Sequence, residues 1–112
     1  MTRTIIVVLL ILLKFIPATG QKITPSPADL YTDALEFMFA GDYSDALPAL
    51  IELQNRGFGS PNISYKIGEC YLSIQGHKVK AIPYLKEASQ NVSGSYSGAT
   101  LEEEEAPYKA LL

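Results

Sequence analysis

The fold is decided by a ten-residue stretch that occurs twice, as GDYSDALPAL at residues 41–50 and as GHKVKAIPYL at residues 76–85. The copies share Gly, Ala, Pro and Leu at equivalent positions, and Leu47 corresponds to Ile82. A Ser-Pro pair precedes each copy, at residues 26–27 and 60–61. The two landmarks recur at offsets of 35 and 34 residues. A period of this length predicts a repeated unit of two helices.

Local signals place the helix boundaries within each unit. Ser26 and Ser60 are favourable N-cap residues, and the proline that follows each one suits the first helical position. Gly41 and Gly76 end these first helices, because glycine readily takes the left-handed conformation of a helix C-terminus. The second helices are expected to begin near residues 44 and 79, so that the proline of the repeated Ala-x-Pro lies close to the first turn. Arg56-Gly57 then ends the first unit.

The helical periodicity is amphipathic and predicts a packed apolar face on every helix. Gly68 and Ala81 are expected to face each other inside the second unit, as small residues that let two helices approach closely. The apolar stripes comprise Leu30, Ala34, Phe37 and Met38, then Ala46, Leu47, Leu50 and Leu53 in the first unit, and Ile67, Gly68, Tyr71 and Leu72, then Ala81, Ile82, Leu85 and Ala88 in the second.

Residues 1–20 differ from the rest and predict a secretory signal peptide. Arg3 precedes a continuous apolar run at residues 5–13, and Ala18 and Gly20 supply the small residues of a cleavage site. Cleavage is expected after Gly20, followed by a linker at residues 21–26. The alternative is a retained membrane anchor, which is disfavoured because a spanning helix needs about 20 apolar residues. We therefore expect contact with the membrane only before cleavage.

The chain has 112 residues, enough for one domain. Without residues 1–20 it loses two of its nine basic side chains and keeps all twelve acidic ones, which gives a formal charge of −5. Nucleic-acid binding is excluded on this basis, because it depends on clustered Lys and Arg. A single cysteine, Cys70, cannot form an intramolecular disulfide.

The C-terminal residues change character. Residues 92–101 are rich in Ser and Gly and predict a loop. Residues 102–112 are interpreted as the start of a third, truncated unit, which begins either with a capping box of Thr100 and Glu103 or with Pro107 at the first helical position. Because this apolar half-unit has no partner helix, the natural product is expected to be longer than 112 residues.

The two units at residues 27–91 resemble the tetratricopeptide repeat (TPR), a pair of antiparallel helices with small and aromatic residues at fixed positions. The matches are Ile67-Gly68, Tyr71, Ala81, Leu85 and Ala88 in the second unit, and Ala34, Phe37, Ala46, Leu50 and Leu53 in the first. The sequence departs from the family pattern in lacking its Trp, in having Asp33 where Leu is usual, and in lacking Pro at the usual distance after Leu53. The resemblance implies an all-α fold, a TPR-like α-solenoid of two units and the start of a third.

The whole arrangement also resembles the N-terminal part of OmpA-family envelope proteins of Bacteroidota-type bacteria. The likeness lies in a signal peptide followed by repeats with IGECYL at residues 67–72 and AIPYLKEA at residues 81–88, then Ala-Pro-Tyr at residues 106–108. It implies an exported protein in the periplasm or associated with the outer membrane. The peptidoglycan-binding domain of those proteins has no counterpart in these residues.

In the TPR family the first helices of successive units line a concave groove. Carried over residue by residue, this implies a site for a protein or peptide partner. The alternative for Leu35, Met38 and Leu72 is ordinary packing against neighbouring helices. A second hypothesis for the whole chain is a structural spacer without a ligand, which holds later domains at the envelope. The predicted groove residues are Tyr31, Leu35, Met38, Asn62, Tyr65, Glu69 and Leu72.

No pattern in the chain predicts catalysis, a metal site or a small-molecule cofactor. His77 lacks a partner at ligand spacing and is expected to be a solvated turn residue. Cys70 is expected to be a small buried residue, because no basic neighbour would lower its pKa. Consecutive glutamates at residues 102–105 project in different directions and are interpreted as a solvated helix start.

Overall fold

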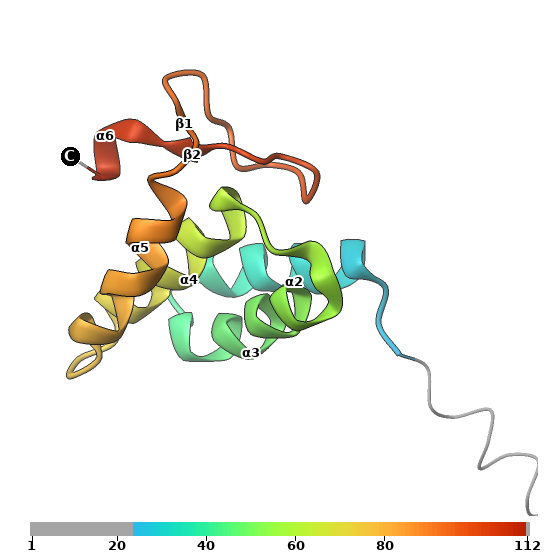
Figure 1. Cartoon of the computed structure of the whole chain (residues 1–112). Coiled ribbons are helices and arrows are strands. Elements are labelled where there is room, and N and C mark those ends of the chain that lie inside the picture. Colours follow the sequence, from blue (N-terminus) through green and yellow to red (C-terminus); the bar gives the residue numbers. More distant parts are fainter. Residues whose placement is uncertain (1–23, 112) are drawn as a thin grey trace, which may run out of the picture.

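The computed structural model describes residues 24–111, which are mostly helical, and four main helices form two hairpins. The first hairpin comprises α2 (Pro27–Phe39) and α3 (Tyr43–Leu53), and the second comprises α4 (Pro61–Ser73) and α5 (Ala81–Ala88). Each pair packs together, and α3 also contacts α4, so the hairpins lie side by side (Figure 1). The predicted all-α character is therefore confirmed for this part of the chain.

The predicted helix starts are confirmed in both hairpins. The Ser26 hydroxyl accepts a hydrogen bond from the amide of Asp29 at 3.1 Å, and the Ser60 hydroxyl accepts one from the amide of Ile63 at 3.2 Å. Each bond satisfies an amide that has no partner within the helix. These caps fix where α2 and α4 begin.

Three glycines lie at or beyond helix ends in left-handed conformations, with φ angles of 82° at Gly41, 93° at Gly57 and 83° at Gly76. Gly41 directly follows the C-cap of α2, as predicted, whereas α4 ends at Ser73 with Ile74 as its C-cap, so Gly76 lies in the turn beyond the helix. Gly57 lies in a π-helical turn, η1 (Gln54–Phe58), that continues α3. In the same turn the Arg56 guanidinium pairs with Glu52 at 2.9 Å and donates to the carbonyl of Pro25 at 2.7 Å. The first hairpin is thereby joined to the segment before α2.

The second helix of the second unit begins later than predicted. A short 3₁₀ helix, η2 (Lys78–Lys80), precedes α5, which starts at Ala81 rather than near residue 79. The turn before α5 closes with i to i+3 bonds, from the amide of Lys80 to the carbonyl of His77 and from the amide of Ala81 to the carbonyl of Lys78. Pro83 alone does not account for this turn, because Pro48 holds the equivalent position in α3, which is α-helical from Tyr43.

The apolar faces predicted from periodicity form the core only in part, because Phe37, Leu72 and Ile82 of those faces are exposed and Ile63, which was not among them, is buried. Leu50, Leu53, Ile63 and Ile67 are fully buried between the hairpins, together with small residues such as Ala34 and Ala46.

The predicted contact between Gly68 and Ala81 is wrong. A Cβ atom at Gly68 would lie 2.6 Å from Leu85 Cδ2, whereas the nearest Ala81 atom is its carbonyl oxygen at 3.6 Å. Gly68 therefore makes room for the Leu85 side chain and does not face that of Ala81.

The C-terminal residues fold differently from the predicted third unit. Two short strands, β1 (Val92–Ser93) and β2 (Ala106–Pro107), pair in parallel, and a short helix, α6 (Tyr108–Leu111), follows. Residues 102–105 are not helical, and Glu103 does not close a capping box, because its carboxylate binds groups within the preceding loop. The capping-box start is therefore wrong, and the helix begins at Tyr108, one residue after the alternative start at Pro107.

The predicted signal peptide at residues 1–20 lies outside the described residues, as does half of the linker at residues 21–26. The same holds for the side chains of residues 110–112. Among the helices that the structure describes, none has the length and apolar character needed to cross a membrane.

Candidate functional site: a covered face of two helices

A loop from the C-terminal part of the chain lies over α2 and α4 (Figure 1). We call residues 94–105, which connect β1 to β2, the cover segment. Its ends are held together where Val92 pairs with Ala106 and Ser93 pairs with Pro107. Ala106 is fully buried, and its amide donates to the carbonyl of Asn91 at 3.0 Å. The cover segment is thus a closed loop anchored at its base, and its middle reaches the helices.

Asn62, near the start of α4, is the centre of the polar contact between the helices and the cover segment. Its amide nitrogen donates to the Tyr31 hydroxyl at 2.9 Å and to the carbonyl of Thr100 at 3.3 Å. Its amide oxygen accepts from the Tyr96 hydroxyl at 2.5 Å. The Tyr31 hydroxyl in turn donates to the carbonyl of Gly98 at 2.5 Å. Since Asn62 is fully buried, these bonds satisfy an amide that would otherwise be costly to remove from water.

Aromatic rings and one lysine complete the contact. The ring of Tyr96 meets that of Tyr65 edge to face, with 5.9 Å between centroids and 75° between planes. Lys66 is 7% exposed, and its ammonium lies 5.9 Å from the ring centroid of Tyr31 and 5.8 Å from that of Tyr96. Both rings offer their negative faces to this charge. The lysine therefore sits between one helix tyrosine and one cover tyrosine.

Burial shifts the pKa values of the two tyrosines and of Lys66 in the directions that favour their neutral forms. Burial raises the pKa of Tyr31, although its hydrogen bond with Asn62 acts in the opposite direction. Burial likewise raises the pKa of Tyr96 and lowers the pKa of Lys66. The tyrosines are therefore hydroxyl donors at neutral pH, as the hydrogen bonds require.

Glu103 holds the cover segment in its shape. Its carboxylate accepts hydrogen bonds from the amide of Ser97 at 2.9 Å, the hydroxyl of Ser97 at 2.8 Å and the amide of Gly98 at 2.6 Å. Burial alone would raise the pKa of Glu103, but these bonds outweigh it and hold that pKa below its ordinary value. We call this set of bonds the Glu103 clasp.

Gly98 is required by both its backbone and its surroundings. Its φ angle is 67°, in the left-handed region that side chains disfavour. A Cβ atom there would lie 2.5 Å from the Tyr96 hydroxyl and 3.0 Å from Lys66 Nζ. A larger residue would therefore displace the groups that hold the segment.

The structure brings three of the seven predicted groove residues together under the cover segment, namely Tyr31, Asn62 and Tyr65. Tyr31 and Asn62 are buried, so in this conformation they contact the chain's own loop and not an open groove. Of the other four, Leu35 and Met38 are half-buried against the core, as the packing alternative proposed. Glu69 is half-buried and Leu72 is 45% exposed.

Sequence analysis missed the groups that complete this site: Lys66, Tyr96, Gly98 and Glu103. Tyr96 is the one aromatic residue of the Ser/Gly-rich loop, and Gly98 is followed by a run of glutamates. An isolated aromatic residue in such a loop was the available signal, because a polar loop has few other groups to bury.

Cys70 and His77, the residues weighed as catalytic or metal-binding candidates, both pack against other side chains of the described chain. Cys70 is fully buried, as predicted, and burial raises the pKa of its thiol to about 12. His77 lies in the turn as predicted, but it is half-buried rather than solvated, and its ring stacks on Tyr71 with centroids 6.3 Å apart. Within residues 24–109, no three His, Cys, Asp or Glu side chains cluster in a way that could hold a metal ion.

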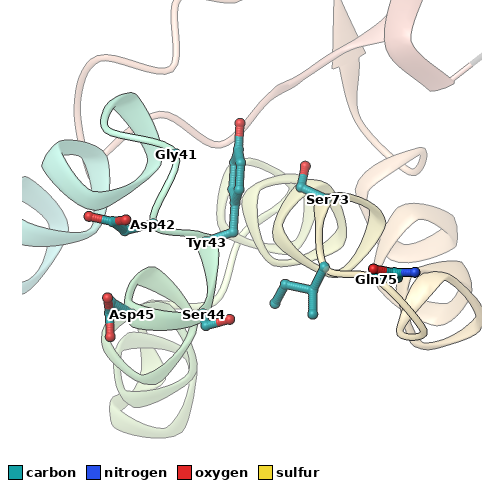
Figure 2. Close-up of a pocket in the computed structure, with 8 residues that line it drawn as sticks. Gly41, Asp42, Tyr43, Ser44, Asp45, Ser73 and Gln75 are labelled. Atoms are coloured by element: carbon teal, nitrogen blue, oxygen red, sulfur yellow. The ribbon is translucent and has the colours of Figure 1, made fainter.

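A separate cavity of about 330 Å³ lies between the α2–α3 turn and the end of α4 (Figure 2). Figure 2 shows Asp42 and Asp45 on one side, Ser73 and Gln75 on the other, and Tyr43 between them. No basic side chain lines this cavity. It is distinct from the covered face and shares none of its residues.

Comparisons with protein-family models, with curated proteins and with solved structures found no match for this chain. The class that the structure itself defines is an all-α protein of two helical hairpins, with one helical face covered by its own C-terminal loop.

Proposed function

We propose that the chain is an exported, TPR-type protein–protein interaction module, and that α2 and α4 form the face that binds a protein or peptide partner. The repeat of 34 to 35 residues supports this assignment, as does the burial of Ala46 and Ala81 at equivalent positions of two consecutive hairpins. A location in the periplasm or at the outer membrane, as the N-terminal part of an OmpA-family-like envelope protein, rests on the resemblance described above.

The observation that carries the proposal is the contact between the helices and the cover segment. The face of α2 and α4 holds an irregular loop of chain through two backbone carbonyls and one tyrosine. Backbone groups supply affinity and side-chain contacts supply specificity when a protein binds a peptide segment in this way. The same side chains can therefore bind a peptide from another molecule.

The accessible part of this face provides the test, namely Leu72 and the exposed portion of Tyr65 beside Tyr96. Tyr65 is half-exposed and Leu72 is exposed, so a Tyr65→Ala/Leu72→Ala variant removes surface without opening the core. We expect the wild-type chain to retain a protein from bacterial envelope extracts and the double variant to lose it. Ile82→Ala is the matched control, because Ile82 is 51% exposed on α5. Equal recovery by all three chains would contradict the proposal.

The second candidate is a structural spacer. It is favoured by one observation, namely that Asn62 and Tyr31 are already satisfied by the cover segment and need no ligand. A spacer predicts that no protein from the extract depends on Tyr65 and Leu72.

Export has a separate test, because residues 1–20 lie outside the described part of the chain. N-terminal sequencing of secreted material should begin at Gln21, and a sequence that begins at Met1 would contradict cleavage.

A further inference from the structure

The cover segment is held by two sets of contacts that can be separated. One set joins it to the helices, through Tyr96, Gly98 and Thr100. The other is the Glu103 clasp, whose hydrogen bonds all lie within the cover segment. The clasp therefore shapes the segment, while the helices bind it.

The helices bind the segment through a short pattern. Tyr96 places its hydroxyl on Asn62 and its ring edge to face with Tyr65. Two residues later, Gly98 presents its carbonyl to Tyr31, and a Cβ atom there would collide with the docked Tyr96 hydroxyl and come within 3.0 Å of Lys66 Nζ. Ser97 between them is exposed, and its hydrogen bonds are to Glu103 and within the loop. The pattern that the helices bind is thus Tyr-x-Gly.

The clasp contributes by fixing this pattern in its bound shape before it meets the helices. Three hydrogen bonds to one carboxylate order Ser97 and Gly98, and a segment ordered in this way loses less conformational entropy on binding. The negative charge also lies near Lys66, which lowers the pKa of Glu103 further.

We propose that the ligand of this face is a peptide loop containing Tyr-x-Gly with an acidic residue about five positions later, and that residues 96–103 are a built-in competitor for it. The proposal rests on the proposed function, because it names the kind of ligand that the face of α2 and α4 takes. A competitor held in the same chain weakens the binding of a free peptide, because the apparent affinity equals the intrinsic affinity multiplied by the fraction of chains in which the face is open.

The experiment uses a fluorescein-labelled synthetic peptide with the sequence of residues 92–105. Its binding to the full chain is followed by fluorescence anisotropy. We compare the wild type with Glu103→Gln, which weakens the clasp in the chain but leaves it intact in the peptide. The matched control is Glu104→Gln, which removes the same charge at an exposed position. We expect the peptide to bind Glu103→Gln about tenfold more tightly than the wild type, and to bind Glu104→Gln as it binds the wild type.

Variant peptides test the pattern without disturbing the protein. Tyr96→Phe removes the hydroxyl that donates a hydrogen bond to Asn62. Gly98→Ala introduces a Cβ atom that would lie 2.5 Å from the Tyr96 hydroxyl. Each should bind the Glu103→Gln chain about tenfold more weakly than the unchanged peptide. A Ser95→Ala peptide is the control, because Ser95 is exposed and bonds only to Ser93 among the described residues.

Hydrogen exchange verifies that the chain variant has opened. The amides of Ser97 and Gly98 donate to Glu103, so they should exchange faster in Glu103→Gln. Unchanged exchange would show that the clasp does not hold the segment and would overturn the proposal. Faster exchange without peptide binding, or equal binding of all four peptides, would overturn it as well. A partner retained from envelope extracts through Tyr65 and Leu72 would, in that case, leave the proposed function standing and refute only this inference.

Discussion

The hydrogen bond between Tyr96 and Asn62 is the contact whose removal most directly tests whether the cover segment is docked. Tyr96→Phe deletes the hydroxyl and leaves the buried amide oxygen of Asn62 without that donor. A buried hydrogen bond contributes about 0.5 to 1.5 kcal/mol, and an unsatisfied buried group costs about 1 to 3 kcal/mol. We expect Tyr96→Phe to lower the free energy of unfolding by about 1 to 2 kcal/mol.

Asn62→Ala removes the same bond from the other side, together with the bonds to Tyr31 and Thr100. We expect this change to cost about 2 to 4 kcal/mol, which is a large share of the 5 to 15 kcal/mol typical of a small domain. Because both changes remove the Tyr96–Asn62 bond, the double variant should lose about 1 kcal/mol less than the two single losses combined.

Urea unfolding of the four chains, followed by circular dichroism, measures this coupling. Tyr84→Phe is the control, because its ring packs against Tyr71 and its hydroxyl bonds to none of the described residues. That change should alter the free energy of unfolding by less than about 0.5 kcal/mol. If the losses at Asn62 and Tyr96 add to within about 0.3 kcal/mol, the bond does not form in solution and the docked arrangement is refuted.

Three further predictions concern packing, pH and thiol reactivity. Gly68→Ala should cost about 1 to 3 kcal/mol, because its Cβ would lie 2.6 Å from Leu85 Cδ2; an unchanged melting temperature would contradict this packing. The pKa of Glu103 is lower in the folded chain than its ordinary value of 4.5, so the stability it contributes is present above that pH and is lost as the pH falls through the folded pKa. Wild type and Glu103→Gln should therefore differ in urea midpoint at pH 7 and converge in acid, and a difference that persists in strong acid would exclude the carboxylate as its cause. Cys70, with its pKa of about 12, should react with a disulfide reagent at pH 8 only after unfolding, and rapid labelling of the folded chain would show that the thiol is accessible.

The helices could be predicted from sequence because their boundaries depend on local chemistry. Ser26 and Ser60 cap the helices that follow them, and Gly41 takes the left-handed conformation just after α2. Each of these effects acts over three or four residues and so leaves a pattern in the sequence. The start of α5 lies two residues later than predicted, and the sequence does not show why, because Pro48 holds the position equivalent to Pro83 in α3, which is α-helical from Tyr43.

Only the helix residues of the site could be predicted from the sequence, and the segment that covers them could not. The resemblance to the TPR family placed Tyr31, Asn62 and Tyr65 on one face, and the structure brings these three together. The segment that covers this face has no periodicity, and its contacts join residues as far apart as Tyr31 and Gly98, 67 positions along the chain. Such contacts depend on how the loop closes after the helices have packed, and no local pattern specifies that closure.

The chemistry of the covered face bears on whether the cover segment can leave it. The contact combines polar groups, namely Asn62, Tyr31 and the carbonyls of the segment, with the Tyr65–Tyr96 ring pair and with Leu101, which packs against the core. When a polar contact opens, its groups exchange protein partners for water, so the net cost is far smaller than the gross strength of the bonds. The apolar part of the contact has no such exchange and opposes opening. The parallel pairing of β1 with β2 and the buried Ala106 hold both ends of the loop in place. We infer that release of residues 94–105 costs less than separation of the two hairpins, whose interface is apolar throughout its buried cluster, and that it exposes the polar face while the hairpins remain folded.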